Sequence, residues 1–191
     1  MANPAVGSVA IAGAGLAGRL LAWRLLRAGV PVTLIDARAR SDRDHAAGVA
    51  AAMLAPYAEL VVSDAHLFGL GEESLALWPR WLAQIREQTG EAVYFRHEGS
   101  LVVAHAPDYP GLAHYADLIR FRLPASKREE VQNLDGEGIA ALEPEFAGRF
   151  ARGLWLPQEG QLDNDQLLGS LQDAILQAMA RVGGQWLERT T

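Results

Sequence analysis

Residues 8–22 read SVAIAGAGLAGRLLA, and here an apolar segment leads directly into Gly13, Gly15 and Gly18. The G-x-G-x-x-G spacing is typical of turns that bind the diphosphate of a dinucleotide. The first glycine allows the tight turn, the second leaves room for the diphosphate, and the third lets the following helix lie close to the sheet. The helix N-terminus, with its unpaired N–H groups, then favours negative charge. We therefore expect a dinucleotide to be bound by Gly13, Ala14, Gly15, Leu16, Ala17 and Gly18.

The residues after the glycines complete a strand–helix–strand unit. Gly29 stands where a helix is expected to end with a left-handed residue, and residues 30–35 form a second apolar strand that ends at Asp36. A carboxylate about twenty residues after the glycines can accept hydrogen bonds from an adenosine ribose. It would also repel the 2′-phosphate of NADP, which favours FAD or NAD. Arg38 and Arg40 either neutralise a phosphate, lie over an adenine face or are solvated.

Composition limits the class of protein. The chain has 191 residues, of which 50% are hydrophobic, so it is long and apolar enough to bury a core. Its net charge of −6 argues against a nucleic-acid surface. There is no cysteine, which excludes disulfides, thiolate zinc sites and a cysteinyl flavin link. No metal site is expected, because four of the five histidines lack metal-binding spacing, namely His66, His97, His105 and His114.

The apolar N-terminus resembles a signal peptide only superficially. It lacks a basic leading region, and its glycines occupy nucleotide-binding positions. Arg19, Arg24 and Arg27 interrupt the longest apolar stretch, so no membrane span is expected. We predict a soluble protein, and the lack of cysteine is compatible with a cytoplasmic location.

The rest of the chain predicts a mixture of helices and short strands. A helix over residues 64–89 is expected to kink or restart at Pro79, and residues 92–96 and 100–105 read as a hairpin. The last helix is the clearest, because Asp163 forms a capping box with Gln166 before an apolar face. Gly183 and Gly184 end that helix, and a strand is expected to begin after them.

An alanine-rich segment, residues 46–58, contains the sequence Met53-Leu54-Ala55-Pro56. Its small side chains would let the backbone approach a planar ligand, or they pack a helix against the sheet. Together with the glycine turn, this segment resembles the flavin-dependent D-amino acid oxidase superfamily, most closely its glycine oxidase branch. The ordered motifs that carry the resemblance are GAGLAG, LIDAR, AAAMLAPYAE, GEESLALW, RHEGSLVVA, LEPEF and the stretch from GLWLP to GQLDN.

The resemblance implies an α/β fold, in which a Rossmann-type FAD-binding domain is interrupted by an inserted α+β substrate domain with an antiparallel sheet. We expect residues 1–75 to begin the FAD-binding domain, 76–160 to belong to the substrate domain, and 161–191 to return to the first. The implied activity is the FAD-dependent oxidation of a small amine or amino acid, such as glycine, sarcosine or a D-amino acid, with oxygen as acceptor. Further implied FAD-binding residues are Asp36, Ala37, Arg38, Ala51, Ala52, Met53 and Leu54.

Two local departures from the family concern the flavin segment. The family usually has glycine where Ala52 stands, and a small hydroxyl residue near Gly48. His45 opens the sequence His-Ala-Ala-Gly, which also resembles the segment carrying a histidyl flavin link in dimethylglycine dehydrogenase-like relatives. The alternative is a histidine that is exposed or hydrogen-bonded.

Family members continue well beyond 191 residues, and the part without a counterpart here supplies the arginine and tyrosine that hold the substrate carboxylate. We therefore expect a truncated, N-terminal portion, assign no catalytic residue, and leave open a homo-oligomer or a second chain that completes the site. Glu59 either lines the substrate cavity or lies on the surface. The alternative functions are a non-catalytic flavin-binding fragment or accessory subunit, and an NAD-dependent dehydrogenase.

Overall fold

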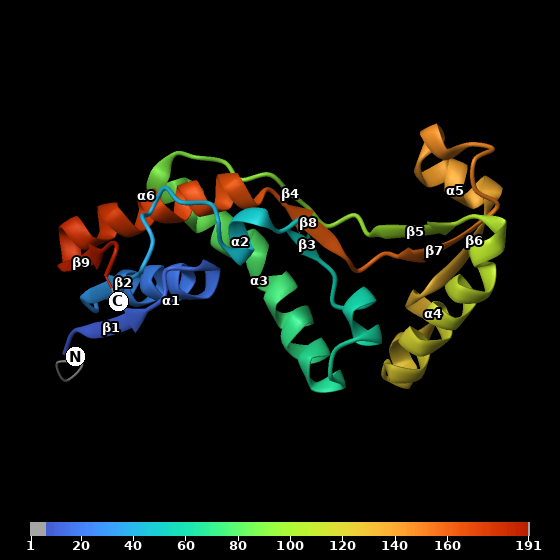
Figure 1. Ribbon diagram of the computed structural model, residues 1–191, viewed down its shortest axis with the longest axis horizontal. Coiled ribbons are helices and arrows are strands. Elements are labelled where there is room, and N and C mark those ends of the chain that lie inside the picture. The colour runs from blue at the N-terminus through green and yellow to red at the C-terminus, as the bar shows by residue number, and fades with distance from the viewer. Residues whose placement is uncertain (1–6, 191) are drawn as a thin grey trace. The chain divides into compact units, whose positions relative to one another are not determined.

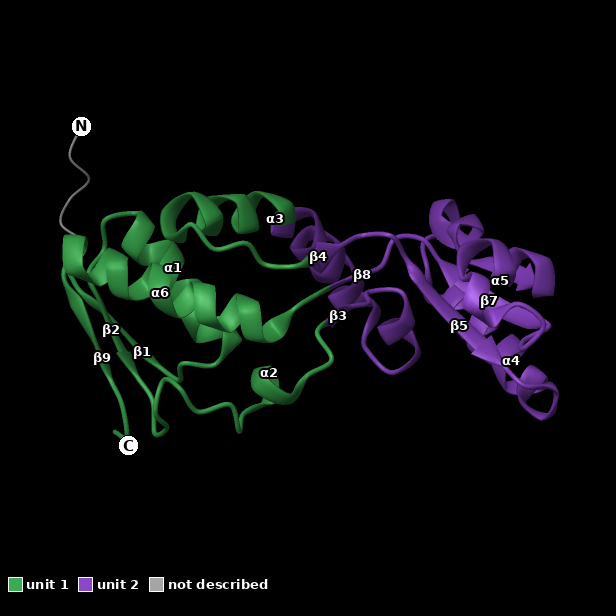
Figure 2. Cartoon of the chain, turned by 90° about the horizontal axis from the view of Figure 1, so that it is seen from above, with its two compact units in different colours: residues 1–52, 79–94, 162–191 green, residues 53–78, 95–161 purple. Residues whose placement is uncertain are grey.

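The computed structural model describes residues 7–190 and divides into two compact units. The first comprises residues 1–52, 79–94 and 162–191, and the second residues 53–78 and 95–161 (Figure 2). The predicted domain limits differ from this division, because residues 53–75 belong to the second unit and residues 79–94 to the first. The assignment of cofactor and substrate roles to these parts stays a prediction.

The first unit contains a parallel three-stranded sheet in the order β1-β2-β9 (Figure 1). β1 (Val9–Ala12) is joined by helix α1 (Leu16–Arg27) to β2 (Val32–Ile35), and helix α6 (Asn164–Val182) precedes β9 (Gly184–Leu187). The register aligns Ile11 with Leu34 and Leu34 with Trp186, and all three side chains are buried. A parallel β-α-β arrangement places the ends of β1 and β2 beside the start of α1.

Local sequence explains the limits of these helices. Gly29 adopts φ +81° just after α1, as predicted for a left-handed end. The predicted cap of α6 is confirmed, because the Asp163 side chain accepts a hydrogen bond from the Gln166 N–H. α1 and α6 pack against each other, and Gln88 joins them by accepting from the Trp23 indole and donating to the Ala174 carbonyl.

The second unit contains two small sheets. One has the order β3-β8-β4, formed by β3 (Met53–Leu54), β8 (Gly160–Leu162) and β4 (Phe95–Arg96). The other is antiparallel in the order β5-β7-β6, formed by β5 (Ser100–Ala104), β7 (Arg152–Leu156) and β6 (Gln132–Asp135).

Helices complete both units. α2 (Ala46–Val49), α3 (Ala65–Thr89), α4 (Tyr109–Arg122) and α5 (Gly136–Leu142) are accompanied by short 3₁₀ turns η1 (Ala58–Val61), η2 (Ala106–Asp108), η3 (Ala125–Glu130) and η4 (Pro144–Phe146). The core of the second unit comprises Tyr57, Leu60, Phe68, Ala116, Ile119, Leu123, Val131, Leu154 and Leu156. Six members come from η1, α3, α4 and β7, and the other three directly precede η1 or follow α4 and η3. Burial of apolar surface thus joins segments distant in sequence.

Two predictions about the middle of the chain require correction. The predicted hairpin is wrong, since β4 pairs in the sheet of β8 whereas β5 pairs with β7. Gly99 (φ +88°) turns the chain between them, and its N–H donates to the Glu159 carbonyl at 2.9 Å. Of the two alternatives expected at Pro79, a restart of the helix is wrong, because α3 is one helix from Ala65 to Thr89, whereas a kink stays a prediction. The two units divide between Trp78 and Pro79.

None of the helices in residues 7–190 is both long and apolar enough to span a bilayer.

Candidate functional site

The three glycines between β1 and α1 have different structural roles. Gly13 adopts φ +100°, and its N–H donates to the Ile35 carbonyl at 2.8 Å, so this residue fixes the turn against β2. A Cβ added to Gly18 would lie 1.9 Å from the Gly13 carbonyl oxygen. A Cβ added to Gly15 would meet no atom within 4 Å. The fold therefore needs glycine at positions 13 and 18, whereas position 15 is open to a ligand.

The N-terminus of α1 has the polarity of an anion site. Gly15 is its N-cap, no side chain among the described residues caps it, and its first turn contains no acidic residue. The first N–H groups of a helix lack intrahelical partners, and the helix dipole adds partial positive charge there. A diphosphate could accept hydrogen bonds from these groups.

Asp36 follows β2 and faces the glycine turn. Its Oδ2 accepts from the Ala14 N–H at 2.6 Å and its Oδ1 from the Arg38 N–H at 2.8 Å. Partial burial is the largest single influence and raises the pKa of Asp36. The two N–H donors and the charges of Arg38 and Arg19 together outweigh it, so that the pKa lies below its usual range. Each carboxylate oxygen has a second lone pair, so Asp36 can still accept from a ligand hydroxyl.

A cavity of about 50 Å³ lies at this corner of the first unit. It is lined by Ala14, Gly15, Arg19, Asp36, Arg38, Ala39, Arg40, His45 and Trp186. We call it the Asp36 pocket. It contains four of the predicted cofactor residues, Ala14, Gly15, Asp36 and Arg38.

Arg19 forms part of the pocket wall and is only 2% exposed. Its guanidinium donates to three carbonyl oxygens, those of Ala14 at 2.8 Å, Leu168 at 3.1 Å and Arg40 at 3.2 Å. It also lies 5.0 Å from the centroid of the Trp186 ring. Burial, the largest cause, lowers the pKa of Arg19, and the nearby Arg43 lowers it further. Arg19 therefore joins α1 to the loop after β2 and to α6.

Arg40 is not free in solvent. Its Nη2 lies 2.7 Å from a Glu188 carboxylate oxygen, and its backbone N–H donates to the same carboxylate at 2.5 Å. Its guanidinium is 5.9 Å from the Trp186 ring centroid. Arg40 therefore fixes the pocket wall to the segment that follows β9.

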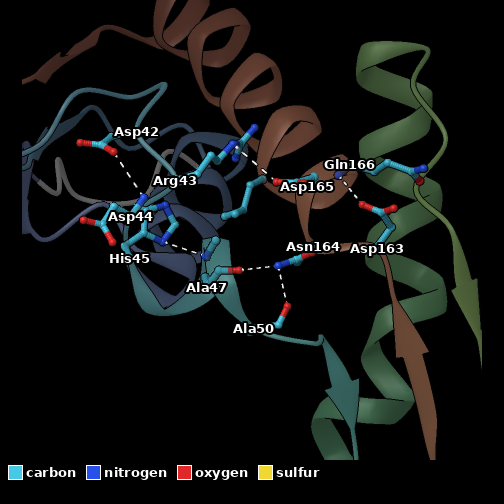
Figure 3. Close-up of polar contacts among 12 residues, drawn as sticks. Asp42, Arg43, Asp44, His45, Ala47, Ala50, Asp163, Asn164, Asp165 and Gln166 are labelled. Carbon is cyan, nitrogen blue, oxygen red and sulfur yellow. Dashed lines mark hydrogen bonds and ion pairs between the residues drawn. The ribbon is translucent and has the colours of Figure 1, made fainter.

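His45 is hydrogen-bonded rather than exposed. It caps α2, and its Nδ1 accepts from the Gly48 N–H at 3.1 Å (Figure 3). The ring nitrogen Nε2 is buried and has no hydrogen-bond partner among the described residues. Gly48 has no space for a side chain, since an added Cβ would lie 2.1 Å from the Arg43 carbonyl oxygen.

The alanine-rich segment after α2 is tied to the start of α6. The Asn164 side-chain amide donates to the Ala47 carbonyl at 2.7 Å and to the Ala50 carbonyl at 2.8 Å (Figure 3). Ala52 then adopts φ +55°, a left-handed conformation in which L-residues are strained. The position at which the family pattern has glycine therefore has a backbone that favours glycine.

The structure brings together only part of the predicted set. Met53 and Leu54 line a different hollow, of about 180 Å³, within the second unit, and Glu59 lines the same hollow. Glu59 is exposed there. Predicted residues that line neither cavity are Gly13, Leu16, Ala17, Gly18, Ala37, Ala51 and Ala52.

Three pocket residues, Arg19, Ala39 and Trp186, were not predicted from the sequence. The available signals were a lone arginine in the first turns of an apolar helix and a tryptophan in the strand after Gly183-Gly184. Within residues 7–190 no group of three acidic or histidine residues could hold a metal ion.

The comparison with known families is consistent with this geometry. Residues 8–191 match the model of the family described as DAO, FAD dependent oxidoreductase. The chain belongs to this DAO family. The predicted α/β fold class, with its Rossmann-type part and its antiparallel sheet, is confirmed.

Relatives of this DAO-family chain include ThiO of Rhizobium etli, whose name describes a thiamine biosynthesis oxidoreductase. The two are 35% identical over 174 residues, which is 91% of this chain and 47% of ThiO. The glycine oxidase structure from Geobacillus kaustophilus has a TM-score of 0.77 at 24% identity, over 95% of this chain and 46% of that one. For the glycine oxidase from Bacillus cereus the TM-score is 0.75 at 23% identity, over 96% and 46%. The chain therefore spans about half the length of these relatives, and the structural likeness shows the fold.

Proposed function

We propose that the protein is an FAD-dependent oxidoreductase that oxidises a small amine or amino acid to the imine and passes the reducing equivalents to oxygen. Membership of the DAO family supports FAD over NAD as cofactor. The name glycine oxidase, which two structures of similar fold carry, supports a small amine or amino acid as the substrate class.

The observation that carries this proposal is the open space at Gly15. The second glycine of the turn has room for a ligand where its Cβ would be, whereas the third has none. The space adjoins an uncapped helix N-terminus, and Gly15 lines the same pocket as Asp36. These are the features that a diphosphate and its ribose require.

In this assignment the chain's residues bind and orient the cofactor. The N–H groups after Gly15 hold the diphosphate, and Asp36 accepts hydrogen bonds from the ribose. Residues 51–54 pass along the isoalloxazine ring. FAD supplies the two-electron oxidation when it is bound, and the protein contributes orientation and electrostatics. The predicted FAD-binding set is Gly13, Ala14, Gly15, Leu16, Ala17, Gly18, Asp36, Ala37, Arg38, Ala51, Ala52, Met53 and Leu54.

The substrate assignment is tested by loading the purified chain with FAD and mixing it with glycine, sarcosine or D-alanine. Loss of the visible flavin absorbance without oxygen, and release of peroxide with oxygen, would support it. Bound flavin that none of these compounds reduces would favour the non-catalytic fragment or accessory subunit. Tighter binding of NAD than of FAD would favour the dehydrogenase.

We propose a small amine or amino acid as the ligand of the whole protein, and either a homo-oligomer or a second chain that completes the site. A cytoplasmic location rests only on the cysteine-free sequence.

A further inference from the structure

Two buried N–H donors of the Asp36 pocket lack hydrogen-bond partners. Nε1 of Trp186 and Nε2 of His45 are buried, and neither has a partner within residues 7–190. Trp186 is 9% exposed, and both residues line the pocket. They come from β9 and from the residue before α2, which are distant in the sequence.

Both nitrogens are hydrogen-bond donors. An indole nitrogen can only donate. Nδ1 of His45 accepts from the Gly48 N–H, so in the neutral ring the proton is on Nε2, which is then a donor as well. Two residues of the pocket wall therefore carry buried N–H groups that need acceptors.

The folded chain does not supply those acceptors. The nearby Arg19 and Arg40 side chains are themselves donors and cannot accept a hydrogen bond. The Asp36 carboxylate accepts from the Ala14 and Arg38 N–H groups, but neither His45 Nε2 nor Trp186 Nε1 donates to it. A buried donor without a partner is unfavourable, and such groups are uncommon in folded proteins. Two in one cavity point to a ligand that carries acceptor atoms.

We propose that His45 and Trp186 are cofactor-binding residues that donate hydrogen bonds, through Nε2 and Nε1, to the adenosine-phosphate half of FAD. This inference rests on the proposed function. We choose the adenosine-phosphate half of FAD because the same pocket contains Gly15 and Asp36, the residues assigned to the diphosphate and the ribose. Phosphate oxygens and purine nitrogens are the acceptors that this half presents.

His45 has a second role in the fold, which the test must separate from ligand binding. It caps α2 through Nδ1, so truncation to alanine would remove the cap and the donor together. Asparagine is a good N-cap residue whose side-chain oxygen can accept from the Gly48 N–H, but it does not reproduce the Nε2 donor. His45→Asn therefore tests the donor, and Trp186→Phe removes the indole N–H while an aromatic ring stays beneath Arg19.

The test measures the affinity of the full chain and of both variants for FAD, ADP and FMN by titration calorimetry. Each variant should bind FAD and ADP about tenfold more weakly. Weak binding of FMN should be unchanged, because FMN lacks the adenosine half. The thermal midpoint of His45→Asn should stay within about 2 °C of the wild type.

Equal affinity of wild type and variants for FAD and ADP would overturn the inference and leave the proposed function standing. A wild-type chain that binds neither ligand would overturn both. If a variant fails to fold, an NMR measurement on the wild type still tests the inference. On addition of ADP, the assigned ¹⁵N resonances of Trp186 Nε1 and His45 Nε2 should shift and their protons should exchange more slowly with water; unchanged resonances at saturating ADP would contradict the inference.

Discussion

Gly15 and Gly18 belong to one turn, but the structure makes only Gly18 necessary for folding. A methyl group at Gly18 would collide with the Gly13 carbonyl at 1.9 Å, whereas one at Gly15 would enter open space. Gly15 has φ −68°, a conformation that alanine adopts readily. The motif therefore contains one glycine that folding requires, Gly18, and one that ligand binding requires, Gly15. Single substitutions can separate the two effects.

We predict that Gly18→Ala lowers the free energy of unfolding by at least about 2 kcal/mol. Gly15→Ala should change it by less than about 0.5 kcal/mol, yet weaken FAD binding at least about tenfold. Urea unfolding and FAD titration of the same samples measure both quantities. Normal FAD affinity in Gly15→Ala would show that the diphosphate does not lie there.

Ala52 offers a second test at this scale. An L-residue in the left-handed region costs about 1–2 kcal/mol, and glycine avoids this cost while losing about 0.5–1 kcal/mol through greater unfolded-state freedom. Ala52→Gly should therefore raise the free energy of unfolding by about 0.5 kcal/mol. Ala51, whose φ is not in that region, is the matched control, and Ala51→Gly should lower it by about 0.5–1 kcal/mol. Equal destabilisation by both substitutions would mean that position 52 is not strained.

At the scale of elements, α2 depends on its neighbours. It has four residues and buries none of them. An isolated helix of this length is unstable, so contacts from outside must hold it. Asn164 provides two of them, at the start of α6.

We predict that Asn164→Asp releases this segment without weakening α6. The carboxylate would face two carbonyl oxygens, but an acidic residue in the first turn of a helix is favourable. Amide hydrogen exchange at residues 46–50 should accelerate about tenfold, while the global unfolding free energy stays within about 0.5 kcal/mol. Asp165→Asn is the control, because it removes an acidic residue of the same first turn and its exposed 3.6 Å pair with Arg43, but neither hydrogen bond of Asn164. Unchanged amide hydrogen exchange at residues 46–50 in Asn164→Asp would show that the two hydrogen bonds of Asn164 do not hold this segment.

Glu159 connects the turn after β7 to η1. It is fully buried, its Oε1 accepts from the Ala58 N–H at 2.7 Å, and burial raises its pKa above the ordinary 4.5. The folded state thus holds the proton to higher pH than the unfolded state, so the stability that this residue contributes is greatest below pH 4.5 and declines as the pH rises towards the folded pKa.

Glu159→Gln keeps an acceptor for Ala58 and removes the titration. We predict that the unfolding free energy of the wild type, relative to this variant, falls as the pH rises above 4.5, by up to about 1.4 kcal/mol per pH unit, and then levels off. Urea unfolding of both proteins across this range measures the difference, in which other titrating groups cancel. A difference that is constant or rises with pH would contradict a raised pKa.

The limits of α1 and α6 could be predicted from local sequence signals, but which strands pair with one another could not. The glycine after α1 and the capping aspartate of α6 act within one turn, so their effects could be predicted. The hairpin around Gly99 failed because β4 and β5 each pair with a strand more than fifty residues later in the chain, an outcome that alternation cannot indicate.

At the scale of the whole molecule, the site residues that could be predicted belong to one continuous motif. Those that could not be predicted join the site through contacts between segments distant in the sequence. The glycine turn and Asp36 belong to one continuous motif, and the sequence indicated them. Arg19 reaches the Leu168 carbonyl 149 residues away, and Trp186 joins the pocket only because β9 pairs with β2. The relation of residues 51–54 to the flavin was inferred from family likeness, and the structure assigns them to two units.

The central claim is that the Asp36 pocket of this DAO-family chain binds FAD. Titration calorimetry of the purified chain with FAD, repeated with Gly15→Ala, tests it most directly. The account predicts one FAD per chain for the wild type and at least about tenfold weaker binding for the variant. No heat of binding in the wild type, or equal affinity in both, would contradict it.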